Sequence, residues 1–482
     1  MMCPLIQEVV TAHTPESLVE QLRGEPGVAL LRTALFDSPR ARYSLVAARP
    51  FLTFRSFGSR CELLFPQAPR VSRVAFGNPW HLLDGWLSRY ELLDEVDLPF
   101  PLGGCFGYWG YDLKNFIEPR LPRRAPDDLQ LPDCSLGFHD SLVVFDHSLN
   151  KTWIISTGLD VDGTRSDARA CKQARFWQTR LSARLPPNEA PRNAPTPVRV
   201  KSNLTRAEFL ARVSRAQDYI RAGDIYQVNL SQRLTAPHPE PGWRLFQRLA
   251  AVSPAPFSAY LDCGDFALVS SSPESFLRLS GPHIQTRPIK GTRPRSPDPA
   301  RDAQLAYELQ TSAKEMAELL MITDLLRNDL GKVCEFGSVQ VPDLVRLERY
   351  PQVQHLVSTV EGCLRPGLTH LSALAACFPG GSITGAPKIR AMEIIDELEP
   401  VARGPYTGGL GYLGFNRESQ LSIVIRAAVC REQTAYFHVG AGIVADSVPA
   451  AEYDETLAKA RGFFDALRLP AQTEVPAEAA AS

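Results

Sequence analysis

The sequence predicts an α+β fold whose sheets are mostly antiparallel and whose two regions are joined by a linker. Short apolar runs alternate with turn residues over 1–183, a pattern typical of antiparallel strands. Prolines cluster in 184–200, which predicts the linker. Strand and helix patterns alternate over 201–468, and the alanine- and proline-rich residues 469–482 predict a disordered tail.

Composition narrows the class of protein. The 482 residues carry 52 Lys+Arg against 53 Asp+Glu, so charge gives no reason to expect nucleic acid or an anionic membrane as partner. No apolar run approaches the ~18 residues that span a bilayer, and the amino terminus lacks a signal-peptide pattern, so we expect a cytoplasmic protein. The 10 cysteines include no Cys-x-x-Cys pair, which favours reduced thiols over disulfides or a zinc site.

In the first region, apolar runs such as 43–46, 142–145 and 152–155 predict strands. A glycine- and aromatic-rich run at 103–112 is expected where strands bend or pack closely. Helical spacing predicts helices near 15–23, 79–91 and 164–182.

The second region opens with Thr205 and Glu208, a capping-box pair that predicts a helix ending at Gly223. A strand is predicted at 225–230, with Gln227, Asn229 and Ser231 on one face and Tyr226, Val228 and Leu230 on the other. A polar, proline-containing segment follows at 293–303. The remaining predictions are helices from Ser312 and at 388–398 and 450–466, and strands at 257–262, 266–270, 275–279, 333–340, 354–360, 408–414, 420–430 and 434–439.

Lys290 is a candidate nucleophile, since it lies between Ile289 and Gly291 near the end of a predicted strand. An apolar pocket would lower the pKa of its ammonium and favour the nucleophilic amine. Gly291 would let a ligand approach the backbone. The alternative is a solvated surface lysine, because lysines are rarely buried.

Two pairs of glutamates stand three residues apart, Glu315 with Glu318 and Glu452 with Glu455, each on a predicted helix. Each pair projects from one helical face. If the pairs face one another, their oxygens suit Mg²⁺. The alternative is that these are solvated glutamates, and Glu315 also completes a capping box.

Two further features suit an anionic ligand. A glycine-rich run ending at Gly385 leads into the helix that begins near Pro387, and helix amino termini bind anions. Arg426 lies inside an apolar predicted strand, where a guanidinium demands a partner such as a substrate carboxylate or a structural carboxylate.

Cys105, with His238 and Glu240, resembles the catalytic residues of a glutaminase. The cysteine lacks a strand-to-helix elbow, however, and the pattern spans the linker.

Taken together, these motifs make the chain resemble the chorismate-utilising enzymes, and within them the aminodeoxychorismate synthase component I family. The likeness is looser before the linker, at 42–44 and 104–112. It implies one composite α+β body, in which an amino-terminal region like that of anthranilate synthase component I packs its sheet on that of a chorismate-binding domain, with helices outside. The motifs that carry it are 223–229, 271–274, 288–292, 324–331, 355–360, 385–388 and 442–447.

The resemblance implies that Lys290 attacks C2 of chorismate as the 4-hydroxyl leaves, and that ammonia then adds at C4 and expels the lysine. Anthranilate synthases typically have alanine at this position. Glu274 matches the family's general acid, a role that requires a protonated carboxyl. Other matches are Thr292 and His355 as active-site residues, Arg426, Tyr406, Gly442 and Gly385 as substrate contacts, and Glu315, Glu318, Glu452 and Glu455 as Mg²⁺ ligands.

The product would be 4-amino-4-deoxychorismate, the precursor of 4-aminobenzoate and folate. The chain shows no credible glutaminase motif, so we expect a separate glutamine amidotransferase subunit, component II, to supply ammonia. The alternatives are an anthranilate or isochorismate synthase, and a catalytically silent binding subunit.

Overall fold

The computed structural model describes residues 3–33, 42–66, 73–93, 95–185, 199–350, 353–468 and 475–476. The predicted linker lies outside the described residues over 186–198, and so does the predicted tail except for 475 and 476. Among the described residues, no helix is both long enough and apolar enough to cross a membrane.

In the described part of the chain, two twelve-stranded antiparallel sheets form the body of the protein. In the first sheet, β20 (Gly385–Ala386) pairs with β12 beside the main path. The strand order along that path is β1 (Leu5–Val9), β10 (Lys151–Ser156), β9 (Ser141–Asp146), β3 (Tyr43–Ala47), β2 (Ala29–Arg32), β13 (Phe257–Asp262), β14 (Ala267–Ser272), β23 (Ala427–Arg431), β24 (Thr434–Ile443), β12 (Gln227–Pro237) and β11 (Lys201–Ser202).

In the second sheet, β18 (Gln340–Arg349) pairs with β19 beside the main path. The strand order is β17 (Ile289–Pro294), β19 (Val353–Cys363), β16 (His283–Arg287), β15 (Ser275–Ser280), β22 (Glu418–Ile423), β21 (Gly409–Gly414), β7 (Gly104–Trp109), β8 (Cys134–His139), β4 (Leu52–Phe57), β5 (Arg60–Leu64) and β6 (Arg73–Phe76).

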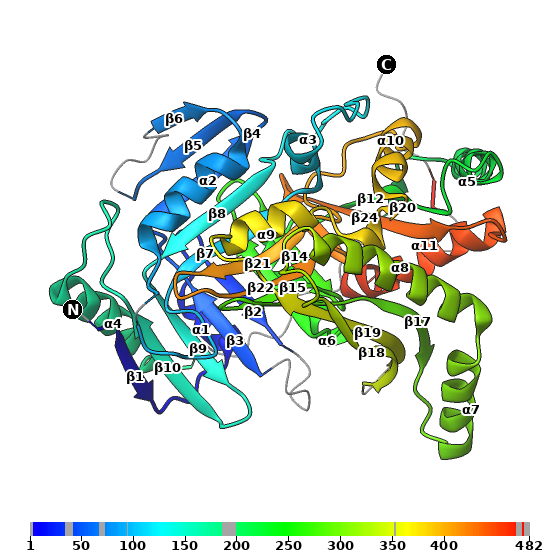
Figure 1. Cartoon of the computed structure of the whole chain (residues 1–482). Coiled ribbons are helices and arrows are strands. Elements are labelled where there is room, and N and C mark those ends of the chain that lie inside the picture. The colour runs from blue at the N-terminus through cyan, green and yellow to red at the C-terminus, as the bar shows by residue number, and fades with distance from the viewer. Residues whose placement is uncertain are drawn as a thin grey trace.

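Both sheets run from one region of the chain into the other. Strand β2 pairs with β13, and β7 pairs with β21, so backbone hydrogen bonds join the parts before and after the linker. Figure 1 shows the amino-terminal strands at the left continuing into the later strands at the right. The predicted composite α+β body is therefore confirmed.

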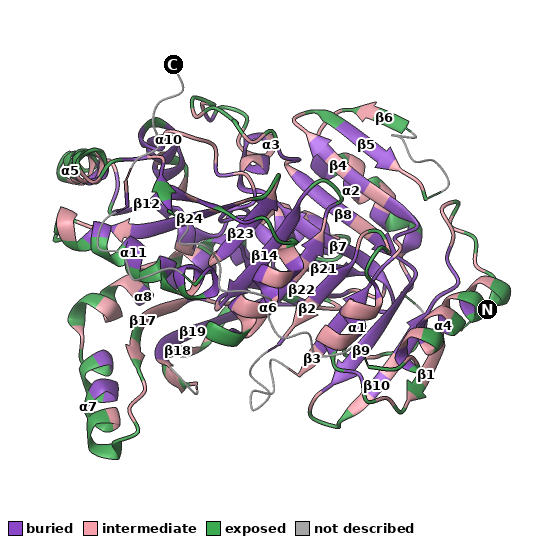
Figure 2. Ribbon diagram, turned by 180° about the vertical axis from the view of Figure 1, so that it is seen from behind, coloured by how far each residue is buried: buried purple, intermediate pink, exposed green. Residues whose placement is uncertain are grey.

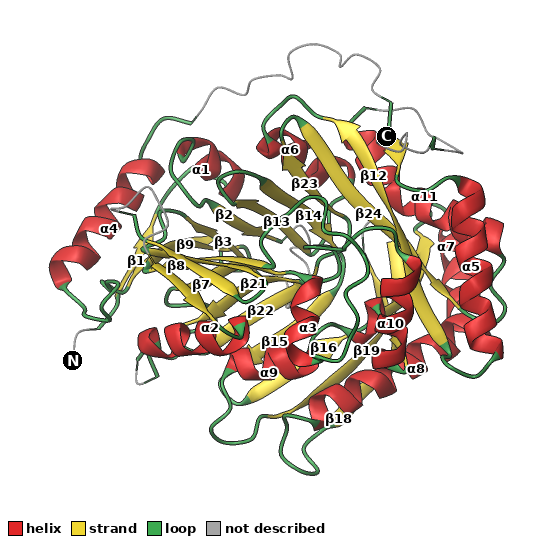
Figure 3. Ribbon diagram, turned by 90° about the horizontal axis from the view of Figure 1, so that it is seen from above, coloured by secondary structure: helices red, strands yellow, loops and turns green. Residues whose placement is uncertain are grey.

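Helices lie outside the two sheets, as Figure 3 shows from above. One set packs on the first sheet: α1 (Pro15–Gln21), α4 (Asp167–Leu181), α5 (Arg206–Arg221), α6 (Gly242–Val252), α10 (Lys388–Leu398) and α11 (Pro449–Ala466). A second set lies along the other sheet: α2 (Pro79–Leu87), α7 (Pro299–Gln310), α8 (Ala313–Gly331) and α9 (His370–Cys377). Short helical turns are η1 (Ser88–Tyr90), η2 (Tyr111–Leu113), α3 (Lys114–Ile117) and η3 (Gly381–Ile383).

Side chains alternate between the two faces of each strand, and this alternation divides the core into two layers. Figure 2 shows that most residues of the central strands are buried. In β9, Val144 packs in a cluster shared with strands of the second sheet, whereas its neighbour Val143 packs in the cluster that also contains Trp177 of α4. All three side chains are fully buried. Burying a side chain such as valine contributes about 1.5–3 kcal/mol, so both faces of the first sheet stabilise the fold.

Several predicted elements match the structure closely. Thr205 caps α5, and Glu208 completes the capping box with its backbone and side-chain hydrogen bonds. Gly223 follows the last turn with φ +81°, the left-handed conformation that glycine adopts readily. In the glycine-rich β7, a Cβ at Gly107 would collide with the carbonyl of Ser135, which explains the close packing predicted for this run.

Other predictions are wrong because tertiary contacts override the local pattern. The predicted strand 333–340 is irregular, with a turn at 336–337 and an isolated bridge from Cys334 to Leu364, and β18 begins only at Gln340. The polar segment 293–303 contains the start of α7, capped by Asp298. The strand predicted from 225 begins only at Gln227, so Tyr226 lies before β12 and does not share a strand face with Val228.

Candidate active site

A cavity of about 800 Å³ gathers most of the predicted site residues. Its walls come from β17 and β19 of the second sheet, β24 of the first sheet, and helices α8 and α11. Gly385 and Glu452 are not among its lining residues. The predicted residues that do line it are Glu274, Lys290, Thr292, Glu315, Glu318, His355, Tyr406, Arg426, Gly442 and Glu455.

Lys290 enters the cavity from β17 with its side chain 19% exposed. The side chain is therefore partly buried, but its Nζ lies 3.3 Å from Oε2 of Glu318, so the ammonium forms an ion pair rather than lying among apolar groups alone. Gly291 has φ +66°, and a Cβ there would lie 2.5 Å from Cδ1 of Leu309. Glycine therefore allows β17 to pass close to α7 and to present Lys290 to the cavity.

Glu274 is buried in the turn between β14 and β15. Burial raises the pKa of its carboxyl, against the opposing effects of a hydrogen bond with Ser382 and the charge of Lys290. The net upward shift favours the protonated form. A carboxyl in this state can donate a proton to a leaving group.

His355 and Thr292 are opposite one another in the register of β19 and β17. The Thr292 hydroxyl lies 2.9 Å from Nδ1 of His355. Burial, followed by a weaker effect of Arg426, lowers the pKa of the imidazole to about 4 despite a hydrogen bond to the Gly291 carbonyl. His355 is therefore neutral near pH 7 and can act as a hydrogen-bonding group in the cavity.

Arg426 lies between β22 and β23, where the predicted strand 420–430 is broken. Its φ of +49° places it in the left-handed region, which is uncommon for a residue with a side chain. Burial lowers the pKa of the guanidinium. The described part of the chain offers its side chain no carboxylate, so an anionic ligand in the cavity would satisfy it.

The four predicted metal ligands divide between α8 and α11. Oε1 of Glu315 lies 3.5 Å from Arg293, Glu455 pairs with Lys459 at 2.8 Å, and Glu452 accepts a hydrogen bond from Ser447 at 2.6 Å. The described residues contain no group of three carboxylates close enough to hold a metal as they stand. The donor chemistry nevertheless fits Mg²⁺, which takes few protein carboxylates and completes its shell with water and substrate oxygens.

Gly385 has a packing role. It pairs with Val228 through β20, and a Cβ there would collide with the carbonyl of Gln227. At the start of α10, Lys388 donates to Asp329 at 2.5 Å and to the carbonyl of Pro379 at 2.9 Å. The glycine-rich run therefore joins α10 to α8 and the first sheet.

Sequence reasoning missed two groups that contact the predicted residues. Ser382 precedes Ile383 in η3 and hydrogen-bonds the Glu274 carboxyl, and no sequence spacing indicated this contact. Lys459 donates to the carbonyl of Gly440 at 2.8 Å while pairing with Glu455. Its position four residues after Glu455 was a usable signal, because such pairs share a helix face.

The glutaminase pattern does not assemble in the structure. Cys105 lies within β7 of the second sheet, where burial raises the pKa of its thiol to about 12. His238 follows β12 of the first sheet, and burial lowers its pKa. A protonated, buried thiol is a poor nucleophile, so Cys105 has the properties of a core residue.

The chain belongs to the chorismate binding enzyme family, which it matches over residues 32–465. It is 46% identical over 468 residues to anthranilate synthase component 1 of Thermus thermophilus, covering 95% of this chain and 96% of that protein. It is 42% identical over 441 residues to aminodeoxychorismate synthase component 1 of Salmonella typhimurium, covering 90% and 91%.

Solved structures agree with the family. The crystal structure of anthranilate synthase component I from Streptococcus pneumoniae matches with a TM-score of 0.77 and 32% identity, over 88% of this chain and 92% of that one. The isochorismate synthase MenF from Escherichia coli shares the fold with a TM-score of 0.69 at 17% identity. The resemblance predicted from the sequence motifs is confirmed at the level of the family.

Proposed function

We propose that this chain is component I of an aminodeoxychorismate synthase, which converts chorismate and ammonia to 4-amino-4-deoxychorismate. Relatives with this name and relatives named anthranilate synthase both match, so identity alone does not choose between the two reactions. The observation that carries the choice is Lys290, whose Nζ reaches the cavity beside Glu318. Anthranilate synthases typically have alanine at this position and lack the nucleophile.

In the proposed reaction, Lys290 passes a proton to Glu318, whose Oε2 lies 3.3 Å from its Nζ. The resulting amine forms a bond to C2 of chorismate while both ring double bonds shift, from C1=C2 and C5=C6 to C1=C6 and C4=C5, and the 4-hydroxyl departs. Glu274 donates a proton to that hydroxyl, which leaves as water, and the buried state of the carboxyl supports this role. Ammonia then bonds to C4, both double bonds shift back, and the bond from C2 to Lys290 breaks, while the new ammonium group at C4 returns a proton to Glu274. The lysine is thereby regenerated.

Charged groups on the walls would hold the two carboxylates of chorismate. Arg426 is a half-buried cation without a carboxylate partner in the described part of the chain, and Tyr406 lines the same cavity. Mg²⁺ would be held by Glu315, Glu318, Glu452 and Glu455, and when bound it would neutralise the ring carboxylate.

The ammonia would come from a glutamine amidotransferase subunit in the cytoplasm. The relatives are named as component 1 of their synthases, which supports a second component. The product would be a precursor of 4-aminobenzoate and folate.

The decisive experiment supplies the purified chain with chorismate, Mg²⁺ and ammonium, and identifies the product by mass after adding an aminodeoxychorismate lyase. We expect 4-aminobenzoate. Lys290→Ala should abolish this product, whereas Lys151→Ala, which removes an exposed lysine paired with Glu8, should retain it. Anthranilate or isochorismate from the unmodified chain would refute the proposal, and no product from folded protein would favour a silent binding subunit.

A further inference from the structure

A buried ion pair lies behind the wall of the cavity. Arg403 and Glu399 are four residues apart, and their side chains are 1% and 4% exposed. Nε of Arg403 donates to Oε2 of Glu399 at 2.8 Å, and Nη2 donates to Oε1 at 2.7 Å. Glu399 also accepts from the backbone N–H and the hydroxyl of Ser231, at 2.8 and 2.9 Å.

The remaining N–H groups of Arg403 bind three separate segments. They donate to the carbonyl of Asn229 at 2.8 Å, to the carbonyl of Ile383 at 3.1 Å and to the hydroxyl of Thr407 at 3.2 Å. A guanidinium has five N–H donors in a rigid fork, and all of them are used here. One side chain, in the segment between α10 and β21, therefore ties that segment to β12, to η3 and to Glu399 at the end of α10.

These three segments also form part of the cavity wall. Asn229, Ile383 and Tyr406 line the cavity, whereas Arg403 does not. Ile383 follows Ser382, which hydrogen-bonds the Glu274 carboxyl. Arg403 is therefore linked to the predicted general acid Glu274 through Ile383 and Ser382. It is linked to the predicted substrate contact Tyr406 through the adjacent Thr407.

The backbone next to Tyr406 is held in an uncommon conformation. Thr407 has φ +61°, a genuine outlier for a β-branched residue. Such strain persists only where surrounding contacts hold it, and Arg403 supplies one of them. The guanidinium also lies over the rings of Tyr111, at 4.7 Å, and of Tyr406, at 5.6 Å. Tyr111 precedes the linker, so the pair also fixes the first region against this wall.

We propose that Arg403, oriented by Glu399, is a positioning residue for the chorismate cavity. It contacts no reacting atom, and it acts by holding Tyr406, Asn229 and the Ser382 segment at their places in the wall. The inference rests on the proposed function for the identity of the ligand. Its test compares each variant with the unmodified chain by the rate of chorismate consumption, whichever product forms, so that a wrong product refutes the proposed function alone.

The first variant is Arg403→Lys, which keeps the charge but replaces a rigid fork with a single ammonium that cannot reach all of these partners. Misplacement of a site by about 1 Å can cost on the order of 100-fold in rate. We expect kcat/KM for chorismate to fall roughly 10- to 100-fold, mainly through KM, with a shifted pH profile. Wild-type kcat/KM in folded Arg403→Lys would overturn the proposal.

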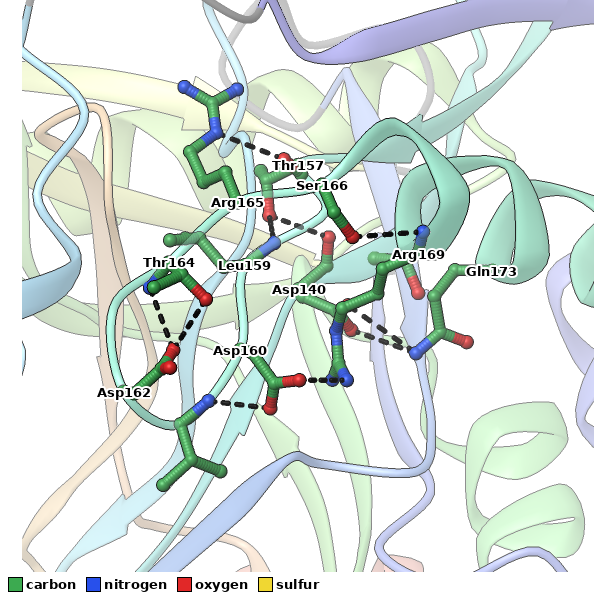
Figure 4. Close-up of polar contacts among 12 residues, drawn as sticks. Asp140, Thr157, Leu159, Asp160, Asp162, Thr164, Arg165, Ser166, Arg169 and Gln173 are labelled. Atoms are coloured by element: carbon green, nitrogen blue, oxygen red, sulfur yellow. Dashed lines mark hydrogen bonds and ion pairs between the residues drawn. The ribbon is translucent and has the colours of Figure 1, made fainter.

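A matched control is Arg169→Lys. Arg169 pairs with Asp140, whose side chain is 2% exposed, in the polar cluster at the start of α4 that Figure 4 shows. Neither residue lines the cavity. Loss of this fork should leave kcat/KM unchanged. An equal loss of activity in both variants would reduce the role of Arg403 to general stability and overturn the proposal.

If Arg403→Lys does not fold, a second pair of variants tests the positioning role. Thr407→Ala removes one acceptor of Arg403 and Thr407→Ser retains it, while both keep a side chain at φ +61°. We expect KM to rise in Thr407→Ala and to return towards the wild-type value in Thr407→Ser. Identical kinetics in the two variants would contradict the positioning role.

Discussion

Gly291→Ala tests whether close packing beside Lys290 is required for the site. The left-handed φ of +66° costs an alanine about 1–2 kcal/mol. The new Cβ would lie 2.5 Å from Cδ1 of Leu309 and 3.1 Å from the Glu315 carboxylate. Leu309 is fully buried against Leu319 and Leu356, so it has little room to move, and overpacking of this kind costs about 1–3 kcal/mol.

The expected loss is therefore about 2–5 kcal/mol of local stability, concentrated where β17 meets α7. Relief of the contact would move the backbone that carries Lys290, and we expect chorismate consumption to fall roughly 10- to 100-fold. Hydrogen exchange of β17 amides measures the first effect, and steady-state kinetics measure the second.

Gly281→Ala is the matched control, because Gly281 has φ +53° but nothing within 4 Å of its Cβ position. It shares the backbone strain without the collision, so it should cost about 1–2 kcal/mol and leave the kinetics unchanged. If the two variants behaved alike in exchange and in activity, the role assigned to packing at Gly291 would be wrong.

Two further predictions concern protonation. Glu274→Gln should lower kcat by about 10²–10⁴-fold with folding retained, because the amide keeps the shape of the side chain but cannot donate a proton as an acid. A near-normal kcat in ammonium assays would show that Glu274 is not the general acid. Burial, together with Arg417, lowers the pKa of His370 to about 4 despite its hydrogen bond to the Gly281 carbonyl. Between about pH 4 and the ordinary histidine pKa of 6.5, the unfolded chain therefore binds more protons than the folded chain. Stability from this group is present above pH 6.5 and is lost as pH falls towards 4, with a slope of up to about 1.4 kcal/mol per pH unit. His370→Gln should reduce the slope of denaturation free energy against pH in this window, and an unchanged slope would show that His370 titrates normally.

Much of the local structure could be predicted from sequence because the determining contacts are short. The capping box of Thr205 and Glu208 spans three residues, and it begins α5 as expected. The spacing of Glu315 and Glu318 likewise places both side chains on one wall of the cavity through α8. The strand predicted over 420–430 failed at Arg426, because its hydrophobic pattern continues across a break that only tertiary contacts impose.

The sequence by itself determined the family, the antiparallel α+β composition and the residue types available for catalysis, because motifs and periodicity act within a few positions of the chain. Only the tertiary structure decided that Lys290 pairs with Glu318, that Arg426 is a half-buried cation facing the cavity, and that Arg403 joins its own segment to Asn229 and Ile383. These features depend on distances between residues far apart in the chain. Such distances are set by how the two sheets pack, which local spacing does not encode.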